Sequence, residues 1–478
     1  MLRRKIGPLI SFVLCSVAGA GWVQLAQAKD DSSTKFCKPP GITSVVNTPQ
    51  SELVLPEFKR DGRVFVFFDA STNMRGFVSS ASGLSQVSDS NYAKLVHVIP
   101  DIVNQVGTSA RYHRYRQELS PISGTEIASV TNPSFYVCDE NTPTDQCDNP
   151  EDQLKQILGI AKGLPGNSLT VITSDFNLSD REVIDTDAGS IRDSIATMFG
   201  NGRSFGFYAI KSDFKGIIHG LPGGVPYDQA LERPVYVMLI GPIEKIIKFR
   251  NVLKKEFSKK LSDQKERFLL FTDKMIKQRI TESSFVKKDY ILNKVKRQDI
   301  FPGIKIPQFG VPKTGGSVAL MVDLNKIQIK ETLRLSDYAV TQKIWMERNR
   351  KLPCDQRWLR LKKAKNLVEV DPPGKQGNRV SLKFFNKIDA MKKLPTRRRY
   401  FLALEIRANS ISLSERHEEW LAGWSFNATT FDNLVKKQAG FFPTMNLDRL
   451  VKLLTSSSKD AFRGGAILSF HAALVRNR

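Results

Sequence analysis

Short runs of consecutive apolar residues alternate with longer stretches in which apolar residues recur every three or four positions. The runs are too short for ordinary helices and suit strands that are buried on both faces of a sheet. They cover Val64–Phe68, Ser168–Thr173, Ser204–Ile210 and Val235–Ile240, and a more polar run, Arg111–Leu119, suits a strand near an edge. The helical pattern covers 92–106, 150–163 and 191–199. This alternation predicts an α/β fold with a doubly wound, mainly parallel sheet.

The pattern changes in the second half of the chain. Residues Ile243–Ile280 follow a helical pattern that carries many lysines. Short strands bounded by prolines are then expected at Ser317–Leu324, Ile327–Leu335, Arg379–Phe385, Tyr400–Arg407 and Ala466–Val475. A helix is expected over Leu447–Leu454, with Asn446 as its N-cap. These elements predict a basic α+β or β-rich C-terminal domain.

The N-terminus has the three parts of a secretory signal. Arg3, Arg4 and Lys5 precede an apolar stretch that ends in Ala26-Gln27-Ala28. An uncleaved membrane anchor is the alternative. We therefore expect an exported protein, periplasmic or secreted, with these segments: signal peptide 1–28, irregular N-terminal arm 29–61, α/β domain 62–243, basic helical connector 244–300 and basic β-rich domain 301–478.

Charge divides the chain into two unlike halves. Residues 1–240 hold 22 Lys and Arg against 25 Asp and Glu, whereas residues 241–478 hold 50 against 23. A strongly basic exported segment favours anionic lipid or an acidic polymer as a partner. No nucleic-acid recognition motif accompanies these charges, so we do not expect DNA or RNA binding.

Four cysteines remain after the signal peptide, and an exported protein can form disulfides from them. Cys138 and Cys147 bracket a polar loop, which favours a local disulfide there. Cys37 and Cys354 would then form the second pair, although three connectivities are open. The Cys-x-x-Cys spacing of zinc sites is absent.

Two of the predicted buried strands end in an acid that has hydroxyl neighbours. Asp69 is followed by Ser71 and Asn73, and Asp175 is preceded by Ser174. Ligands of open α/β sheets bind at the carboxyl ends of the strands, and oxygen atoms of this kind suit Mg²⁺, Mn²⁺ or Ca²⁺. The alternative is that both acids cap the helices that follow them.

The stretch Val64–Met74 resembles the start of a von Willebrand factor A (vWA) domain, in which a strand ends in Asp-x-Ser-x-Ser. The stretch Thr170–Asp175 is similar to a later strand of that family, and the likeness covers residues 62–243. The chain thus resembles exported bacterial proteins that contain a vWA-like domain.

The resemblance implies a metal-ion-dependent adhesion site with a divalent cation, Mg²⁺ or else Mn²⁺ or Ca²⁺. Its ligands would be Asp69, Ser71 and Asn73 on the first loop, Thr125 on the second and Asp175 on the third. An acidic group of a protein partner would fill the open position of the metal. Asn73 stands where the family has serine, which makes the site degenerate, and Thr142 and Thr144 are rivals of Thr125.

Two functions are compatible with these features. The first is a non-enzymatic adhesion or scaffold protein that binds a protein partner through the cation site and an anionic envelope surface through its basic half. The alternative is a metal-dependent hydrolase such as a phosphoesterase. A P-loop and a Gly-x-Ser-x-Gly elbow are both absent from the sequence.

Overall fold

A computed structural model of the 478-residue chain gives the fold. It describes residues 37–42, 58–79, 89–116, 119–136, 153–183, 186–224, 226–228, 230–258, 267–273, 308–310, 318–323, 333–362, 367–371, 379–384, 394–413, 415–436, 440–462 and 465–476. The predicted signal peptide 1–28 and the predicted pair Cys138 and Cys147 lie outside the described residues, as do Thr142 and Thr144.

Seven strands of the first half form one sheet. They are β1 (Arg63–Asp69), β2 (Ser109–Tyr115), β3 (Leu119–Ile122), β4 (Leu169–Ser174), β5 (Ser204–Asp213), β6 (Glu232–Gly241) and β7 (Arg267–Phe271). Their order across the sheet is β3-β2-β1-β4-β6-β5-β7. The four apolar runs are thereby confirmed as strands. The polar run is confirmed as a strand over Arg111–Tyr115, next to the edge strand β3, but its predicted last residue, Leu119, begins β3.

The sheet is mixed, so the prediction of a mainly parallel sheet is wrong. β1 is parallel to β2 and β4, whereas β6 is antiparallel to β4 and β5, and β7 is antiparallel to β5. Adjacent parallel strands need a long crossover connection, usually a helix. Between β5 and β6 the described residues contain only the short 3-10 helix η3 (Pro222–Gly224), and the chain returns antiparallel. A buried apolar run does not by itself indicate its direction.

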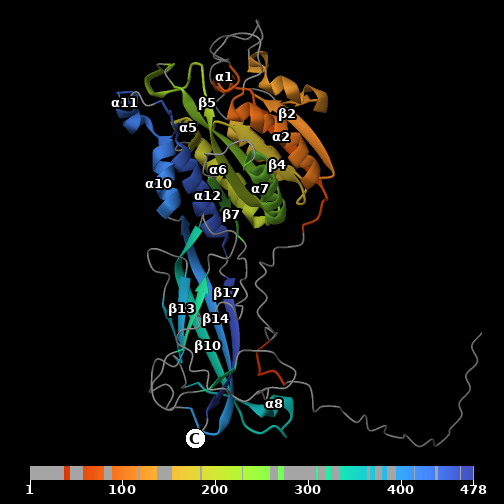
Figure 1. Ribbon diagram of the computed structural model, residues 1–478, viewed down its shortest axis with the longest axis vertical. Coiled ribbons are helices and arrows are strands. Elements are labelled where there is room, and N and C mark those ends of the chain that lie inside the picture. The colour runs from red at the N-terminus through yellow and green to blue at the C-terminus, as the bar shows by residue number, and fades with distance from the viewer. Residues whose placement is uncertain are drawn as a thin grey trace, which may run out of the picture.

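Helices cover both faces of the sheet, which gives the predicted α/β class (Figure 1). Helices α2 (Asn91–Val106) and α7 (Ile243–Ser258) pack together on one face. Helices α4 (Gln153–Gly163) and α6 (Thr186–Gly200) pack together on the other. Because side chains alternate along a strand, β1 contributes Val64, Val66 and Phe68 to the first core and Phe65 and Phe67 to the second.

Short helical segments connect other elements of the chain. They are α1 (Thr72–Arg75), α5 (Asp180–Val183), α8 (Cys354–Arg357), η1 (Gly124–Thr131) and η2 (Pro133–Tyr136). Among the described residues, the helices are all too short or too polar to cross a membrane.

Strand β7 lies in a segment that the sequence pattern assigned to one long helix. Helix α7 ends at Ser258, and residues 267–271 form a buried strand that pairs with β5. The helical prediction for Ile243–Ile280 is therefore wrong at these five positions. Four consecutive apolar residues, Phe268–Phe271, cannot all face the core from one side of an amphipathic helix. In the strand all four are buried, because the sheet is covered on both faces.

The last helices of the chain complete the α/β part. These are α10 (Glu415–Trp424), α11 (Ala428–Lys436) and α12 (Leu447–Ala461). Helix α12 lies against α6 and contributes Leu447, Leu450, Val451 and Leu454 to the second core. The predicted helix over Leu447–Leu454 is thus confirmed, and it belongs to the same body as the seven-stranded sheet.

Asn446, just before α12, does not act as the predicted side-chain cap. It has a left-handed backbone with φ of 58° and makes no side-chain hydrogen bond to its own helix. Its Nδ2 atom donates instead to the Leu178 carbonyl oxygen at 3.0 Å and to Asp180 Oδ1 at 2.8 Å. The amide therefore ties the C-terminal helix to the loop that follows β4.

Strands β10, β13, β14 and β17 extend away from the α/β part (Figure 1). The larger of their sheets contains β8 (Gln308–Gly310), β10 (Leu333–Glu347), β11 (Trp358–Arg360), β14 (Arg398–Leu413) and β17 (Gly465–Arg476), in the order β11-β10-β14-β17-β8. A second sheet contains β9 (Val318–Asp323), β12 (Val368–Asp371) and β13 (Arg379–Phe384), and a third pairs β15 (Ser425–Phe426) with β16 (Thr444–Met445). Strand β14 leads into α10, and α12 leads into β17, so the C-terminal helices lie between two long strands.

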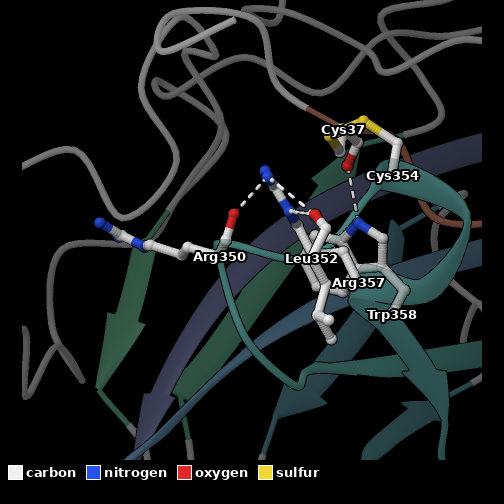
Figure 2. The surroundings of a disulfide bond; sticks show 6 residues. All are labelled: Cys37, Arg350, Leu352, Cys354, Arg357 and Trp358. Atoms are coloured by element: carbon white, nitrogen blue, oxygen red, sulfur yellow. Dashed lines mark hydrogen bonds between the residues drawn. A yellow bond between two sulfur atoms is a disulfide. The ribbon is translucent and has the colours of Figure 1, made fainter.

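A disulfide joins Cys37 to Cys354 at the far end of the long sheet (Figure 2). This pair belongs to one of the three connectivities that the sequence allowed. The Trp358 indole nitrogen donates to the Cys37 carbonyl oxygen at 2.7 Å. Cys354 lies in α8, directly before β11. The described segment 37–42 is therefore fixed to this end of the sheet.

Candidate functional site

Asp69 and Asp175 lie side by side at one edge of the seven-stranded sheet. Strands β1 and β4 are parallel neighbours, and Phe68 is opposite Thr173 in the register. The residues that follow each strand therefore meet at the same edge. Both carboxylates are buried, with 4% and 3% of their residue surfaces exposed.

Asp69 is held by hydrogen bonds from both loops. The Ser174 hydroxyl donates to its Oδ2 at 2.6 Å, and the Ser71 amide donates to its Oδ1 at 2.8 Å. Burial raises the pKa of Asp69 to about 7, and the negative charge of Asp175 is the second cause of this rise. The hydrogen bonds from Ser174 and Ser71 act in the opposite direction. Near neutral pH this carboxyl group is thus divided between its acid and its ionised form.

Asp175 is paired with a buried arginine that the sequence analysis missed. Arg233 Nη2 lies 3.0 Å from Asp175 Oδ2, and the arginine side chain is fully buried. The Asn177 amide donates to Asp175 Oδ1 at 3.2 Å. Burial lowers the pKa of Arg233, and the Asp175 charge acts in the opposite direction.

Two phenylalanine rings surround the guanidinium group. Arg233 Cζ lies 5.8 Å from the ring centre of Phe77 and 4.9 Å from that of Phe214. The Nε, Nη1 and Nη2 atoms of Arg233 all lack a hydrogen-bond acceptor among the described residues, and Asp175 Oδ2 lacks a donor there, so the Arg233–Asp175 contact is an ion pair without hydrogen-bond geometry. The negative faces of the two rings thus provide part of the stabilisation that acceptors would otherwise give.

The side chain of Asn73 bonds the loop after β1 to the β5–β6 connection. Its Oδ1 accepts a hydrogen bond from the His219 amide at 2.8 Å, and its Nδ2 donates to the His219 carbonyl at 3.3 Å. Asn177 Nδ2 donates to the same carbonyl at 3.4 Å. A Cβ atom at Gly76 would overlap the Phe214 ring, so glycine permits the loop after β1 to lie close to the 214–219 segment. This segment therefore lies against the loops that carry Asn73 and Asn177.

The turn that carries Asp175 is strained and is held by a segment from the C-terminal end. Phe176 has φ of 44°, in the left-handed region that non-glycine residues rarely adopt. Its amide donates to the Ser174 hydroxyl at 2.9 Å. Thr444 Oγ1 donates to the Asp175 carbonyl at 3.2 Å and accepts from the Tyr236 hydroxyl at 3.1 Å. The position of Asp175 thus depends on residues far away in the sequence.

The structure brings four of the five predicted ligands to this edge, and Thr125 is not joined to them. Asp69, Asn73 and Asp175 are buried there, and Ser71 is half-buried. Thr125 is exposed in η1, where its hydroxyl lies 2.9 Å from that of Ser123. No hydrogen bond among the described residues connects Thr125 to either carboxylate.

The arrangement does not fit the divalent cation that the resemblance implies. The guanidinium of Arg233 already stands beside Asp175. Two unit charges of the same sign about 4 Å apart repel by about 4 kcal/mol at an effective dielectric constant near 20, and a divalent cation would double this to about 8 kcal/mol. The amide oxygen of Asn73 is already bound to a backbone amide. Among the described residues, no group of three or more His, Cys, Asp and Glu side chains could hold a metal ion.

Sequence reasoning missed Arg233 because its position depends on strand direction. Arg233 is the second residue of β6, and an antiparallel β6 begins at the edge where β1 and β4 end. In a parallel sheet the first residues of this strand would lie at the opposite edge. The available signal was the lack of a helical pattern between Ile210 and Val235, which favours an antiparallel return.

Comparisons with protein-family models, with curated proteins and with solved structures give no match to this chain. The structure itself establishes an α/β class with a mixed sheet. The resemblance to vWA domains thus stays a prediction.

Proposed function

We propose that this chain is an exported interaction protein that docks to an anionic surface through the far end of its long sheet. The observation that carries this proposal is a cluster of exposed basic side chains, here called the basic end. It consists of Arg348, Arg350, Lys351, Arg360, Lys362, Arg397 and Arg398. These residues come together because the end of β10 pairs with both β11 and the start of β14.

Acidic side chains are few at this end. Among the described residues around α8 and β11, Asp355 is the exposed acid, and Glu347 is buried with its Oε2 3.7 Å from Arg350 Nε. An excess of positive charge on one surface attracts an anionic partner by Coulomb interaction. Leu359, which is 43% exposed, adds an apolar group beside Arg360.

The backbone of the basic end is held in place by its own contacts. Arg357 donates to the carbonyl oxygens of Arg350 and Leu352 (Figure 2), and Arg398 Nη1 donates to the Arg348 carbonyl at 3.2 Å. The disulfide at Cys354 fixes the same loop. A backbone that is already fixed loses little conformational entropy on binding.

Anionic phospholipid headgroups are the partner that best fits an exported protein with this charge. A basic residue near an anionic bilayer contributes about 1 kcal/mol. The test is co-sedimentation of the full chain with phosphatidylcholine vesicles, with and without phosphatidylglycerol. We expect binding only to the anionic vesicles, and weaker binding as salt is raised.

The decisive variant is Lys351→Glu with Arg360→Glu and Lys362→Glu. Three lost contacts of about 1 kcal/mol each predict binding weaker by at least about a hundredfold, because each glutamate also adds a charge that the anionic surface repels. The control carries the same change of charge at exposed lysines of the α/β part, as Lys162→Glu with Lys254→Glu and Lys255→Glu. Equal loss in both variants, or equal binding to neutral vesicles, would refute the proposal.

We also propose that the α/β part has a vWA-like arrangement and binds a protein partner. The support is the adjacency of β1 and β4, which puts Asp69 and Asp175 at one edge as the resemblance implies. Since both carboxylates are covered, we propose a partner surface made by the loops around them and independent of metal. Capture of a partner from envelope extract should then be equal with and without chelator, and loss with chelator would contradict this. The hydrolase alternative stays a prediction.

A further inference from the structure

The edge of the seven-stranded sheet holds two buried carboxylates, and buried negative charge needs a positive partner. Asp175 and Asp69 belong to one network, since the Asp175 charge raises the pKa of Asp69. A divalent cation is one way to balance such a pair. A positively charged side chain is another.

We infer that the guanidinium of Arg233 is the built-in cation of this site and takes the place of a metal ion. Its Nη2 atom lies 3.0 Å from Asp175 Oδ2, within an ion pair that is 0% and 4% exposed at its two side chains. Full burial of an arginine is costly unless a specific anion accompanies it. The protein therefore folds with its own counter-charge, and the site is independent of divalent metal.

Aromatic rings and backbone hydrogen bonds surround the Arg233 guanidinium. Phe77 and Phe214 present their rings to the guanidinium from two different loops. The Phe214 amide donates to the Leu231 carbonyl at 2.8 Å, which holds the ends of the β5–β6 connection together beside Arg233. The same connection reaches Asn73 and Asn177 through the His219 peptide. The cation thus joins three loops: those after β1 and β4, and the β5–β6 connection.

A double-mutant cycle with Asp175→Asn and Arg233→Met tests the pairing, with the melting temperature of the full chain measured near pH 8. Each single change leaves one buried charge without its partner, so each should lower the melting temperature by about 5 °C or more. The double variant removes both charges and should melt higher than either single variant. Arg233→Lys keeps the charge and should fall between Arg233→Met and the wild type.

The matched control cycle uses Lys245 and Asp61. Lys245 Nζ lies 2.9 Å from Asp61 Oδ1, but Asp61 is 51% exposed, so water compensates for its loss. Asp61→Asn with Lys245→Met should give no recovery in the double variant. Additive effects in the Asp175 and Arg233 cycle would overturn the inference.

A direct binding measurement covers the case in which Arg233→Met does not fold. The electron paramagnetic resonance signal of dissolved Mn²⁺ falls when the ion binds protein. Wild type and Asp175→Asn should leave the same signal. Binding by the wild type that Asp175→Asn abolishes would overturn the inference. The vesicle assay has no bearing on this result, because the basic end lies at the far end of the long sheet (Figure 1).

Discussion

Replacing Asp69 by asparagine should remove a large part of the pH dependence of stability. The folded-state pKa of Asp69 is about 7, against 3.8 for an unperturbed aspartate. The folded protein therefore holds this proton more tightly than the unfolded chain. Stability from this group is fully present below about pH 4 and is lost as the pH rises to about 7.

The size of the effect follows from the pKa difference. About 3 pKa units at 1.36 kcal/mol each give a loss of about 4 kcal/mol between pH 4 and pH 7. Asparagine has nearly the same shape, and it can still accept from the Ser71 amide and donate to the Ser174 hydroxyl. Because it carries no charge, Asp69→Asn should be more stable than the wild type near pH 8 and close to it near pH 4.

The assay is urea denaturation of wild type and variant at several values of pH, with the difference in free energy of unfolding plotted against pH. The difference should change by about 4 kcal/mol across this range and level off above pH 7. The control is Asp213→Asn, at an exposed carboxyl group at the end of β5. A flat difference for Asp69→Asn, or an equal slope for the control, would refute the reasoning.

Two further predictions concern stability. Cys37→Ser with Cys354→Ser removes a crosslink across a sequence separation of 317 residues and should lower the free energy of unfolding by about 2–5 kcal/mol, measured against wild type under oxidising conditions. Leu450→Ala, in the core between α12 and the sheet, should cost about 2–5 kcal/mol, whereas Lys452→Ala on the exposed side of α12 should cost less than about 1 kcal/mol. If Leu450→Ala left the unfolding of the seven-stranded sheet unchanged, α12 would not belong to that body.

Strands β1, β4, β5 and β6 of the α/β part could be predicted because burial determines their sequence directly. Val64–Phe68 and Ser168–Thr173 must be apolar where helices cover both faces of a sheet, and both runs form strands. The adjacency of Asp69 and Asp175 followed from the same pattern and from the resemblance to vWA domains. The helix over Leu447–Leu454 was also visible, since its apolar side chains recur at helical spacing.

Other features depended on contacts between residues that are distant in the sequence. Residues 267–271 became an edge strand because β5 offered a free side for pairing. Asn446 was expected as a cap of its own helix, and its amide crosses instead to residues 178 and 180. Local sequence carries no information about such partners.

The sequence by itself determined which apolar runs form the central strands, which acids end two of them and that positive charge accumulates in the second half of the chain. Each of these follows from local composition and periodicity. Only the tertiary structure decided what the acids face. The antiparallel direction of β6 brings Arg233 to the edge where Asp69 and Asp175 lie, and strand direction is set by the connection and by pairing with neighbours. A site that its sequence marks for a metal cation thus contains an arginine.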